Sequence, residues 1–322
     1  MRKFGTAAAW TLVVGVSVAA AGCGQVDGLK AKMAFKDANG LYQQQDYRAA
    51  KGKYEEALAL DPNLTDAYFF LANSSDNLYK FSKKGDPAND ALLTQAVDMY
   101  KQAGERATQP NIRKLALEYL VAAYNNPDKI NDPAAAEPLL LKMIEMDPKE
   151  TANLFALAKV YEDFGDYERA EQMLLKAKEV APTQSAVYMQ LAGYYNRQGE
   201  FDKTIEALQQ RAEKEPTNPE AFYTISTYYW DKAYRDFRMP EADKRKMVQA
   251  GVDNVDKALS IKADYDEALV YKNLLLRLQA NMEKDAGKQA SLLKQADALR
   301  DKAEALRKAK TANAAGAPAK AS

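Results

Sequence analysis

Hydrophobic positions recur along this chain at a fixed spacing. Leu154, Leu157, Ala158 and Tyr161 lie three, four and seven residues apart from the first of them, so they share one face of a helix. The same four positions return thirty-four residues later, and again after a further thirty-four. The later copies are Tyr188, Leu191, Ala192 and Tyr195, followed by Phe222, Ile225, Ser226 and Tyr229.

A second helix is predicted in each period. Gly165-Asp166 interrupts the first helix and supplies a turn and a helix start. Ala170, Leu174 and Ala177 then form a face that packs back, and Pro182 ends the unit. One such hairpin cannot bury its own apolar face, so neighbouring hairpins must stack. The pattern therefore predicts an all-α chain of antiparallel helical hairpins.

Residues 151–184 resemble the tetratricopeptide repeat (TPR) family at nearly every characteristic position, from Leu154 to Pro182. The resemblance implies a right-handed α-solenoid over residues 31–283, followed by a capping helix at 284–308. The tail 309–322 has no periodicity and is expected to be disordered. The predicted repeats are about 31–64, 65–110, 111–148, 151–184, 185–218, 219–263 and a partial repeat at 264–283.

The repeat at 185–218 departs from this pattern at two positions. Thr204 and Arg211 stand where small alanines are expected. Because a larger polar side chain hinders close helix contact, the sequence predicts looser packing there.

The N-terminus predicts export. Met1-Arg2-Lys3 is basic, and an apolar run of small residues follows from Ala7 to Ala21. Residues 1–22 are therefore interpreted as a secretory signal peptide. Cys23, the one cysteine of the chain, follows directly and resembles the lipidated cysteine of bacterial lipoproteins.

That second resemblance implies a location. It implies a lipid anchor at Cys23, a short tether at 23–30 and a place in the bacterial cell envelope. Gly24 is not the aspartate that retains such proteins at the inner membrane, so the periplasmic face of the outer membrane is expected. The alternative is an ordinary signal peptide with an incidental cysteine.

Composition argues against catalysis and against nucleic acid. The chain has 45 basic and 45 acidic residues, a net charge of zero, whereas phosphate contacts need a basic surface. It has no histidine, which removes the commonest general base and metal ligand. A non-enzymatic protein is predicted, with no cofactor, no metal and no small-molecule substrate.

The resemblance also implies a binding groove, because first helices line the concave face in this family. Aromatic side chains there can bury peptide side chains while asparagines bond the peptide backbone. The alternative is that these aromatic residues pack as ordinary core. The same stripe contains Tyr42, Asp76 and Glu162. The candidate groove residues are Phe35, Asn39, Phe69, Asn73, Phe155, Lys159, Met189, Asn196, Tyr223, Thr227 and Trp230.

The sequence thus predicts a scaffold or adaptor lipoprotein that binds peptides or proteins in the cell envelope. A periplasmic chaperone or carrier, or a regulatory subunit for exported envelope proteins, remains the alternative. The protein partner is not identified by any motif.

Overall fold

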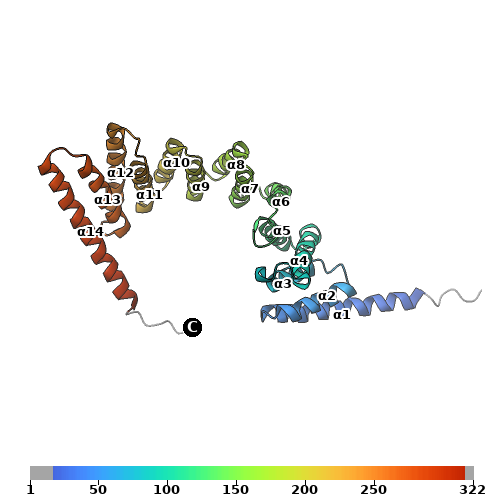
Figure 1. Cartoon of the computed structure of the whole chain (residues 1–322). Helices are drawn as coiled ribbons and strands as arrows, with labels where there is room; N and C mark the ends of the chain where they lie inside the picture. The colour runs from blue at the N-terminus through green and yellow to red at the C-terminus, as the bar shows by residue number, and fades with distance from the viewer. Residues whose placement is uncertain (1–16, 316–322) are drawn as a thin grey trace, which may run out of the picture. The chain divides into compact units, whose positions relative to one another are not determined.

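A computed structural model describes residues 17–315, with side chains for residues 26–312, and every regular element within those residues is helical (Figure 1). The prediction of an all-α protein built from helical hairpins is confirmed. The chain divides into two compact units, 1–160 and 161–322.

The first unit stacks consecutive helices in chain order. Contacts join α1 to α2, α2 to α3, α3 to α4, α4 to α5 and α5 to α6, and α1 also touches α3. Each predicted repeat therefore supplies one antiparallel pair. The elements are α1 (Ser17–Gln43), α2 (Tyr47–Leu60), α3 (Ala67–Leu78), a 3-10 turn η1 (Phe81–Lys83), α4 (Pro87–Arg106), α5 (Pro110–Asn125), α6 (Pro133–Met146) and the start of α7 (Thr151–Asp163).

The second unit continues the same construction. Contacts run from α8 to α9 and onward through α14, and α11 also touches α13. The elements after α7 are α8 (Tyr167–Val180), α9 (Ser185–Arg197), α10 (Phe201–Lys214), α11 (Pro219–Arg235), α12 (Glu241–Ile261), α13 (Asp266–Met282) and α14 (Ala286–Ala315).

The turns inside the hairpins follow the predicted chemistry. Gly165 and Gly199 have φ of +76° and +77°, a backbone conformation that glycine adopts at no steric cost. Gln45 occupies the equivalent place in the first hairpin and also has positive φ, at 62°. Asp46 and Asp166 then cap the following helices, since each carboxylate accepts a hydrogen bond from the backbone N–H three residues on, at 3.1 Å.

Small residues line the contacts between helices. Ala158 is 3% exposed and Ala192 is fully buried, as their place in the repeat predicts. Gly251 of α12 lies even closer to its neighbour: a Cβ at this position would stand 2.8 Å from Cδ2 of Leu275 and 3.3 Å from Cβ of Tyr229. The backbones of α12 and α13 can therefore approach each other this closely only because Gly251 has no side chain.

The prediction of loose packing at Thr204 and Arg211 is wrong. Thr204 is fully buried, and its hydroxyl donates to the carbonyl of Glu200 at 2.9 Å. The Arg211 side chain is 7% exposed, with Nε 3.1 Å from a Glu215 oxygen and Nη2 3.3 Å from a Glu220 oxygen. Two carboxylates neutralise the guanidinium, which allows it to be buried where alanine was expected.

Several predicted boundaries also change. The segment 23–30, expected to be a tether, lies within α1. The C-terminal helix reaches Ala315, so 309–315 is helical rather than disordered, while 316–322 lie outside the described residues. The predicted partial repeat is a complete hairpin, because α13 packs on α14. Residues 1–16 of the predicted signal peptide also lie outside the described residues.

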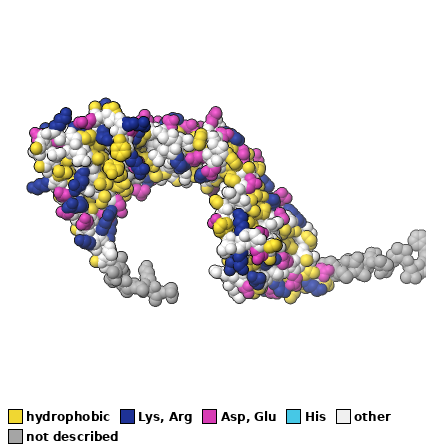
Figure 2. Space-filling model, viewed as in Figure 1, with side chains coloured by type: hydrophobic (Ala, Val, Ile, Leu, Met, Phe, Trp, Pro, Cys, Tyr) yellow, Lys and Arg dark blue, Asp and Glu magenta, His cyan; other side chains and the backbone are white. Residues whose placement is uncertain are grey.

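Charge is distributed evenly over the visible surface. Lys and Arg side chains alternate with Asp and Glu side chains on the face shown in Figure 2. About half of the ion pairs described join residues three or four apart in the sequence, such as Lys51 with Glu55 at 2.6 Å. Exposed pairs of this kind contribute little to stability, so burial of apolar faces holds the hairpins together.

An exception joins α14 to α13. Asp266 begins α13, its side chain is 5% exposed, and it is paired with Arg307 at 3.2 Å and with Lys310. The Lys310 ammonium, followed by the Arg307 guanidinium, lowers the pKa of Asp266 from 3.8 to about 2. The charge at the start of α13 thereby fixes the far part of α14.

We expect substitution of Gly251 to destabilise the second unit. In Gly251→Ala the added methyl meets Leu275, which is fully buried and has little room to move, and overpacking of this kind costs about 1–3 kcal/mol. Chemical denaturation followed by circular dichroism measures the change. Gly52→Ala is the matched control: nothing lies within 4 Å of its Cβ, so it should gain about 0.5–1 kcal/mol of stability. Equal effects of the two substitutions would contradict the close approach at Gly251.

We expect the contact between α13 and α14 to weaken in acid. Because the pKa of Asp266 is lower when folded, the stabilisation is complete above its ordinary value of 3.8 and is lost as the pH falls through about 2. Hydrogen exchange of α14 between pH 4.5 and 2 measures the loss. Asp266→Asn should weaken protection at neutral pH and remove this part of the acid dependence, whereas Asp301→Asn, an exposed control, should leave both unchanged.

Candidate functional site

The predicted groove residues of the second unit lie beside further aromatic rings. Trp230 of α11 stacks on Tyr234, with ring centroids 5.0 Å apart and planes 10° from parallel. Tyr271 of α13 meets Trp230 edge-on at 5.5 Å and Tyr223 edge-on at 5.4 Å. Tyr223 also contacts Tyr265 at 5.2 Å. We call Tyr223, Trp230, Tyr234, Tyr265 and Tyr271 the aromatic face.

The aromatic face is only partly covered. Tyr234 is 53% exposed, and the other four rings are half-buried. Burial raises the pKa of Tyr223 to about 12, so its hydroxyl stays protonated to a higher pH than that of an ordinary tyrosine. An apolar surface with hydroxyl groups at its edge favours contact with another protein chain.

Sequence reasoning found part of this face and missed the rest. Tyr223 and Trp230 were predicted, and Thr227 between them on α11 is half-buried, with its hydroxyl bonded to the carbonyl of Thr224 at 2.7 Å. Tyr234 could have been found, since it lies one helical turn beyond Trp230. Tyr265 and Tyr271 come from the next repeat, outside the predicted stripe.

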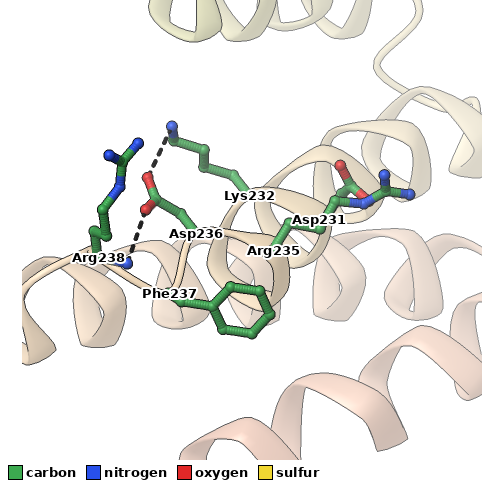
Figure 3. Close-up of a pocket in the computed structure, with 6 residues that line it drawn as sticks. All are labelled: Asp231, Lys232, Arg235, Asp236, Phe237 and Arg238. Atoms are coloured by element: carbon green, nitrogen blue, oxygen red, sulfur yellow. Dashed lines mark hydrogen bonds and ion pairs between the residues drawn. The ribbon is translucent and has the colours of Figure 1, made fainter.

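An open cleft lies at the end of α11 and in the loop that leads to α12 (Figure 3). It has a volume of about 520 Å³, and Phe237 at its edge is 87% exposed. Arg235 pairs with Asp231 at 2.5 Å, and Lys232 pairs with Asp236 at 3.2 Å. The Lys232 ammonium lowers the pKa of Asp236 below its ordinary value. Four of the charged residues that line the cleft are thus paired with one another.

The other predicted residues on α7 and α9 do not form a comparable cluster. Phe155 is half-buried and Lys159 is exposed. The sulfur of Met189 accepts a hydrogen bond from Arg211 at 3.1 Å, while Asn196 is exposed. Glu162 is held by Arg197 through two bonds of 2.6 and 2.8 Å. The predicted residues on α9, Met189 and Asn196, include no aromatic ring.

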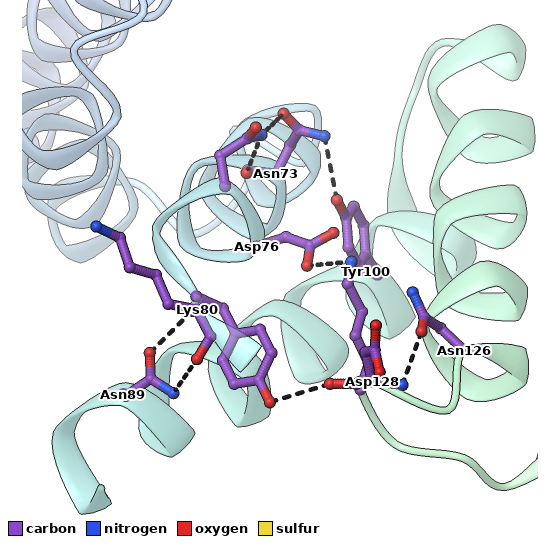
Figure 4. A network of polar contacts seen from close by, with 10 residues as sticks. Asn73, Asp76, Lys80, Asn89, Tyr100, Asn126 and Asp128 are labelled. Atoms are coloured by element: carbon purple, nitrogen blue, oxygen red, sulfur yellow. Dashed lines mark hydrogen bonds and ion pairs between the residues drawn. The ribbon is translucent and has the colours of Figure 1, made fainter. Parts of the chain in front are cut away.

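In the first unit, the predicted asparagines are bonded inside the fold. The Tyr54 hydroxyl donates to the Asn39 side-chain oxygen at 2.7 Å. The Tyr42 hydroxyl donates to Asn73 at 2.7 Å. The Asn73 amide donates to the Tyr100 hydroxyl at 3.2 Å (Figure 4). Burial raises the pKa of Tyr54 and of Tyr100 far above the ordinary value of 10.0, which keeps these hydroxyls protonated.

The prediction that Phe69 and Asn73 line an open groove is therefore wrong. They are 6% and 4% exposed, and the Phe69 ring packs against Tyr100 and Tyr119 at 5.9 and 5.7 Å. Phe35 is half-buried and packs against Tyr54. For these residues the alternative interpretation as core applies.

The loop between α5 and α6 covers one end of the same stripe. Lys129 of this loop pairs with Asp76 at 2.5 Å, and the Tyr79 hydroxyl donates to the carbonyl of Asp128 at 3.2 Å (Figure 4). Asp76 is consequently 9% exposed at its side chain. The stripe of the first unit is thus filled by its own side chains and by this loop.

Within residues 26–312 no group of three or more His, Cys, Asp or Glu side chains is arranged to hold a metal ion. No helix in the described part of the chain has the length and hydropathy of a membrane span.

Comparison with known proteins agrees with the helical hairpins. The tetratricopeptide repeat family model matches residues 131–193. The C-terminal part of a TPR repeat-containing protein from Cytophaga hutchinsonii is 16% identical with a TM-score of 0.56, over 84% of this chain and 98% of that one. No match was found among curated proteins.

Other solved structures are similar over shorter or looser alignments. A tetratricopeptide repeat protein from Parabacteroides merdae is 14% identical with a TM-score of 0.47, over 84% of this chain and 99% of that one. A protein named MamA is 20% identical with a TM-score of 0.40, over 56% of this chain and 92% of that one. The family match covers residues 131–193, and the repeat period and the helical hairpins continue on both sides of it: this chain contains tetratricopeptide repeat sequence and has the helical-hairpin fold of such proteins.

Proposed function

We propose that this protein is a non-enzymatic scaffold or adaptor that binds a segment of another protein on the aromatic face. The observation that carries the proposal is the set of five partly exposed rings on α11, on α13 and at Tyr265 just before α13, whose neighbouring centroids lie 5.0–5.5 Å apart. Rings held in place by other rings lose little conformational freedom on binding, so they suit the anchor positions of an interface.

The proposal places binding in the second unit rather than along the whole predicted stripe. In the first unit the equivalent positions are occupied by internal hydrogen bonds and by the loop around Lys129. A ligand there would have to break bonds that the chain already makes. On the aromatic face, Tyr234 presents half of its surface without such a cost.

The first experiment is a pull-down with the full chain, followed by mass spectrometry. One partner captured in fixed ratio supports the scaffold. Capture of many unfolded exported proteins would instead favour the alternative, a chaperone or carrier that binds its clients on the same face.

Truncation of the face should then reduce capture of that partner. Tyr234→Ala and Trp230→Ala each remove an anchor, and loss of a central aromatic anchor costs at least about 2 kcal/mol, or some thirtyfold in affinity. Binding is measured by calorimetry, and thermal stability is measured in parallel.

Tyr167→Ala is the matched control, because Tyr167 is 49% exposed in the same unit but lies outside the aromatic face. It should leave affinity unchanged. If Tyr234→Ala binds as tightly as Tyr167→Ala, the aromatic face is not the binding surface.

We also propose that Cys23 carries a lipid anchor and that the protein resides in the cell envelope, at the periplasmic face of the outer membrane. The support is the basic start, the short apolar run and the cysteine directly after Ala20-Ala21-Gly22. Each buried methylene of an acyl chain contributes about 0.8 kcal/mol, so several chains give a stable anchor.

Cys23→Ser should abolish lipid attachment and leave either a soluble or an unprocessed species. Fractionation of membranes and labelling with a radioactive fatty acid measure both effects. A processed Cys23→Ser protein that still sediments with membranes would overturn the anchor, while leaving the aromatic face untouched.

A further inference from the structure

A second apolar pocket lies in the first unit, where the ends of three helices meet. Its volume is about 270 Å³, slightly below the range of roughly 300–1,000 Å³ typical of drug-sized ligands. It therefore matches one large side chain rather than a whole cofactor. The pocket is lined by Pro110, Asn111 and Lys114 of α5, by Met143, Met146 and Asp147 at the end of α6, and by Asn153 of α7.

Methionines form the apolar wall of this pocket. Met143 is 4% exposed and Met146 is 47% exposed, so one is fixed in the core and the other stands at the opening. Methionine is flexible, and its sulfur makes favourable contacts with the edges of aromatic rings. Together with Pro110 the two side chains form a surface suited to an aromatic ring.

Asn153 supplies a polar group in the same pocket. It is 5% exposed, and no hydrogen bond described within residues 26–312 involves its side-chain amide. Other buried asparagines of this unit are bonded: Asn73 to Tyr100, and Asn89 to the carbonyl of Lys80. An amide that lines the pocket offers both a donor and an acceptor to a ligand.

Charge at the opening selects against carboxylates. Lys114 is paired with Glu150 at 3.2 Å and with Glu118 at 3.9 Å, and the bond to Glu150 raises the pKa of Lys114. Asp147 lines the pocket as well. Three carboxylates around one ammonium leave negative charge, which disfavours a C-terminal carboxylate or an acidic side chain.

We propose that this pocket binds an aromatic side chain within an internal peptide segment, whose backbone amide pairs with Asn153. The segment belongs to a protein partner and carries no carboxylate at this point. The site goes beyond the aromatic face: it stands in the first unit on its own contacts, so either site can fail without the other.

The test uses the full chain with ¹³C-labelled methionine methyl groups and N-acetyl-phenylalaninamide as the probe. The ring should shift the resonances of Met143 and Met146, while Met33, which is 59% exposed on α1, stays unchanged. N-acetyl-alaninamide should cause no shift. N-acetyl-phenylalanine, which carries a free carboxylate, should bind several-fold more weakly.

Variants test the role of the amide. Asn153→Ala should weaken the phenylalaninamide probe about two- to tenfold, the range of one neutral hydrogen bond. Asn63→Ala, an exposed asparagine of the same unit, should not. Met146→Glu alters only the half-exposed wall, so it should keep the fold and abolish binding.

Three results would overturn the proposal. They are an absence of shifts with N-acetyl-phenylalaninamide, equal shifts with N-acetyl-alaninamide, or unchanged affinity in both Asn153→Ala and Met146→Glu. If Asn153→Ala does not fold, Met146→Glu alone decides. Tight binding of N-acetyl-phenylalaninamide to the Met146→Glu variant would reject the site.

Discussion

Close approach of helix backbones is the constraint on which this structure depends. A hairpin of two short helices has too little apolar surface to be stable alone, so each must bury one face against the next. That burial is possible only where side chains at the crossing are small. Ala50, Ala57, Ala72 and Ala103 in the first unit are fully buried, and Gly104 has Leu117 within 2.8 Å of where its Cβ would lie.

Larger residues fill the space between the helices that the small residues leave unoccupied. Tyr54 and Tyr100 are fully buried, and their hydroxyls need partners because an unbonded buried hydroxyl is costly. Asn39 and Asn73 supply those partners on neighbouring first helices. In α10, Arg211 plays a comparable part with Glu215 and Glu220. Polar bonds of this kind tie adjacent helices together at positions where apolar packing alone would leave a gap.

The sequence predicted the hairpins because their signals are local. Helix faces, Gly165 and Gly199 in the turns, and Asp46 and Asp166 at the caps all depend on residues within a few positions. The groove was predicted less well because exposure depends on distant residues. Nothing near Asp76 in the sequence indicates that Lys129, fifty-three positions later, pairs with it. At Tyr223 and Trp230, which lie partly exposed in the aromatic face, the role of peptide anchor stays a prediction.

The end of the C-terminal helix was also predicted wrongly, because it too depends on residues distant in the sequence. Its charged sequence was interpreted as a cap that ends at 308, with disorder beyond. The structure extends it to Ala315, and the reason lies in α13: Asp266 begins that helix and pairs with Arg307 and Lys310 near the end of α14. Ala296 and Ala303 meanwhile bury the apolar side of α14. The end of this helix, which its composition alone suggests would fray, is therefore held by a carboxylate of the other helix in the same hairpin. Contact with the nearest neighbour in the chain supports α14 as it supports every earlier repeat.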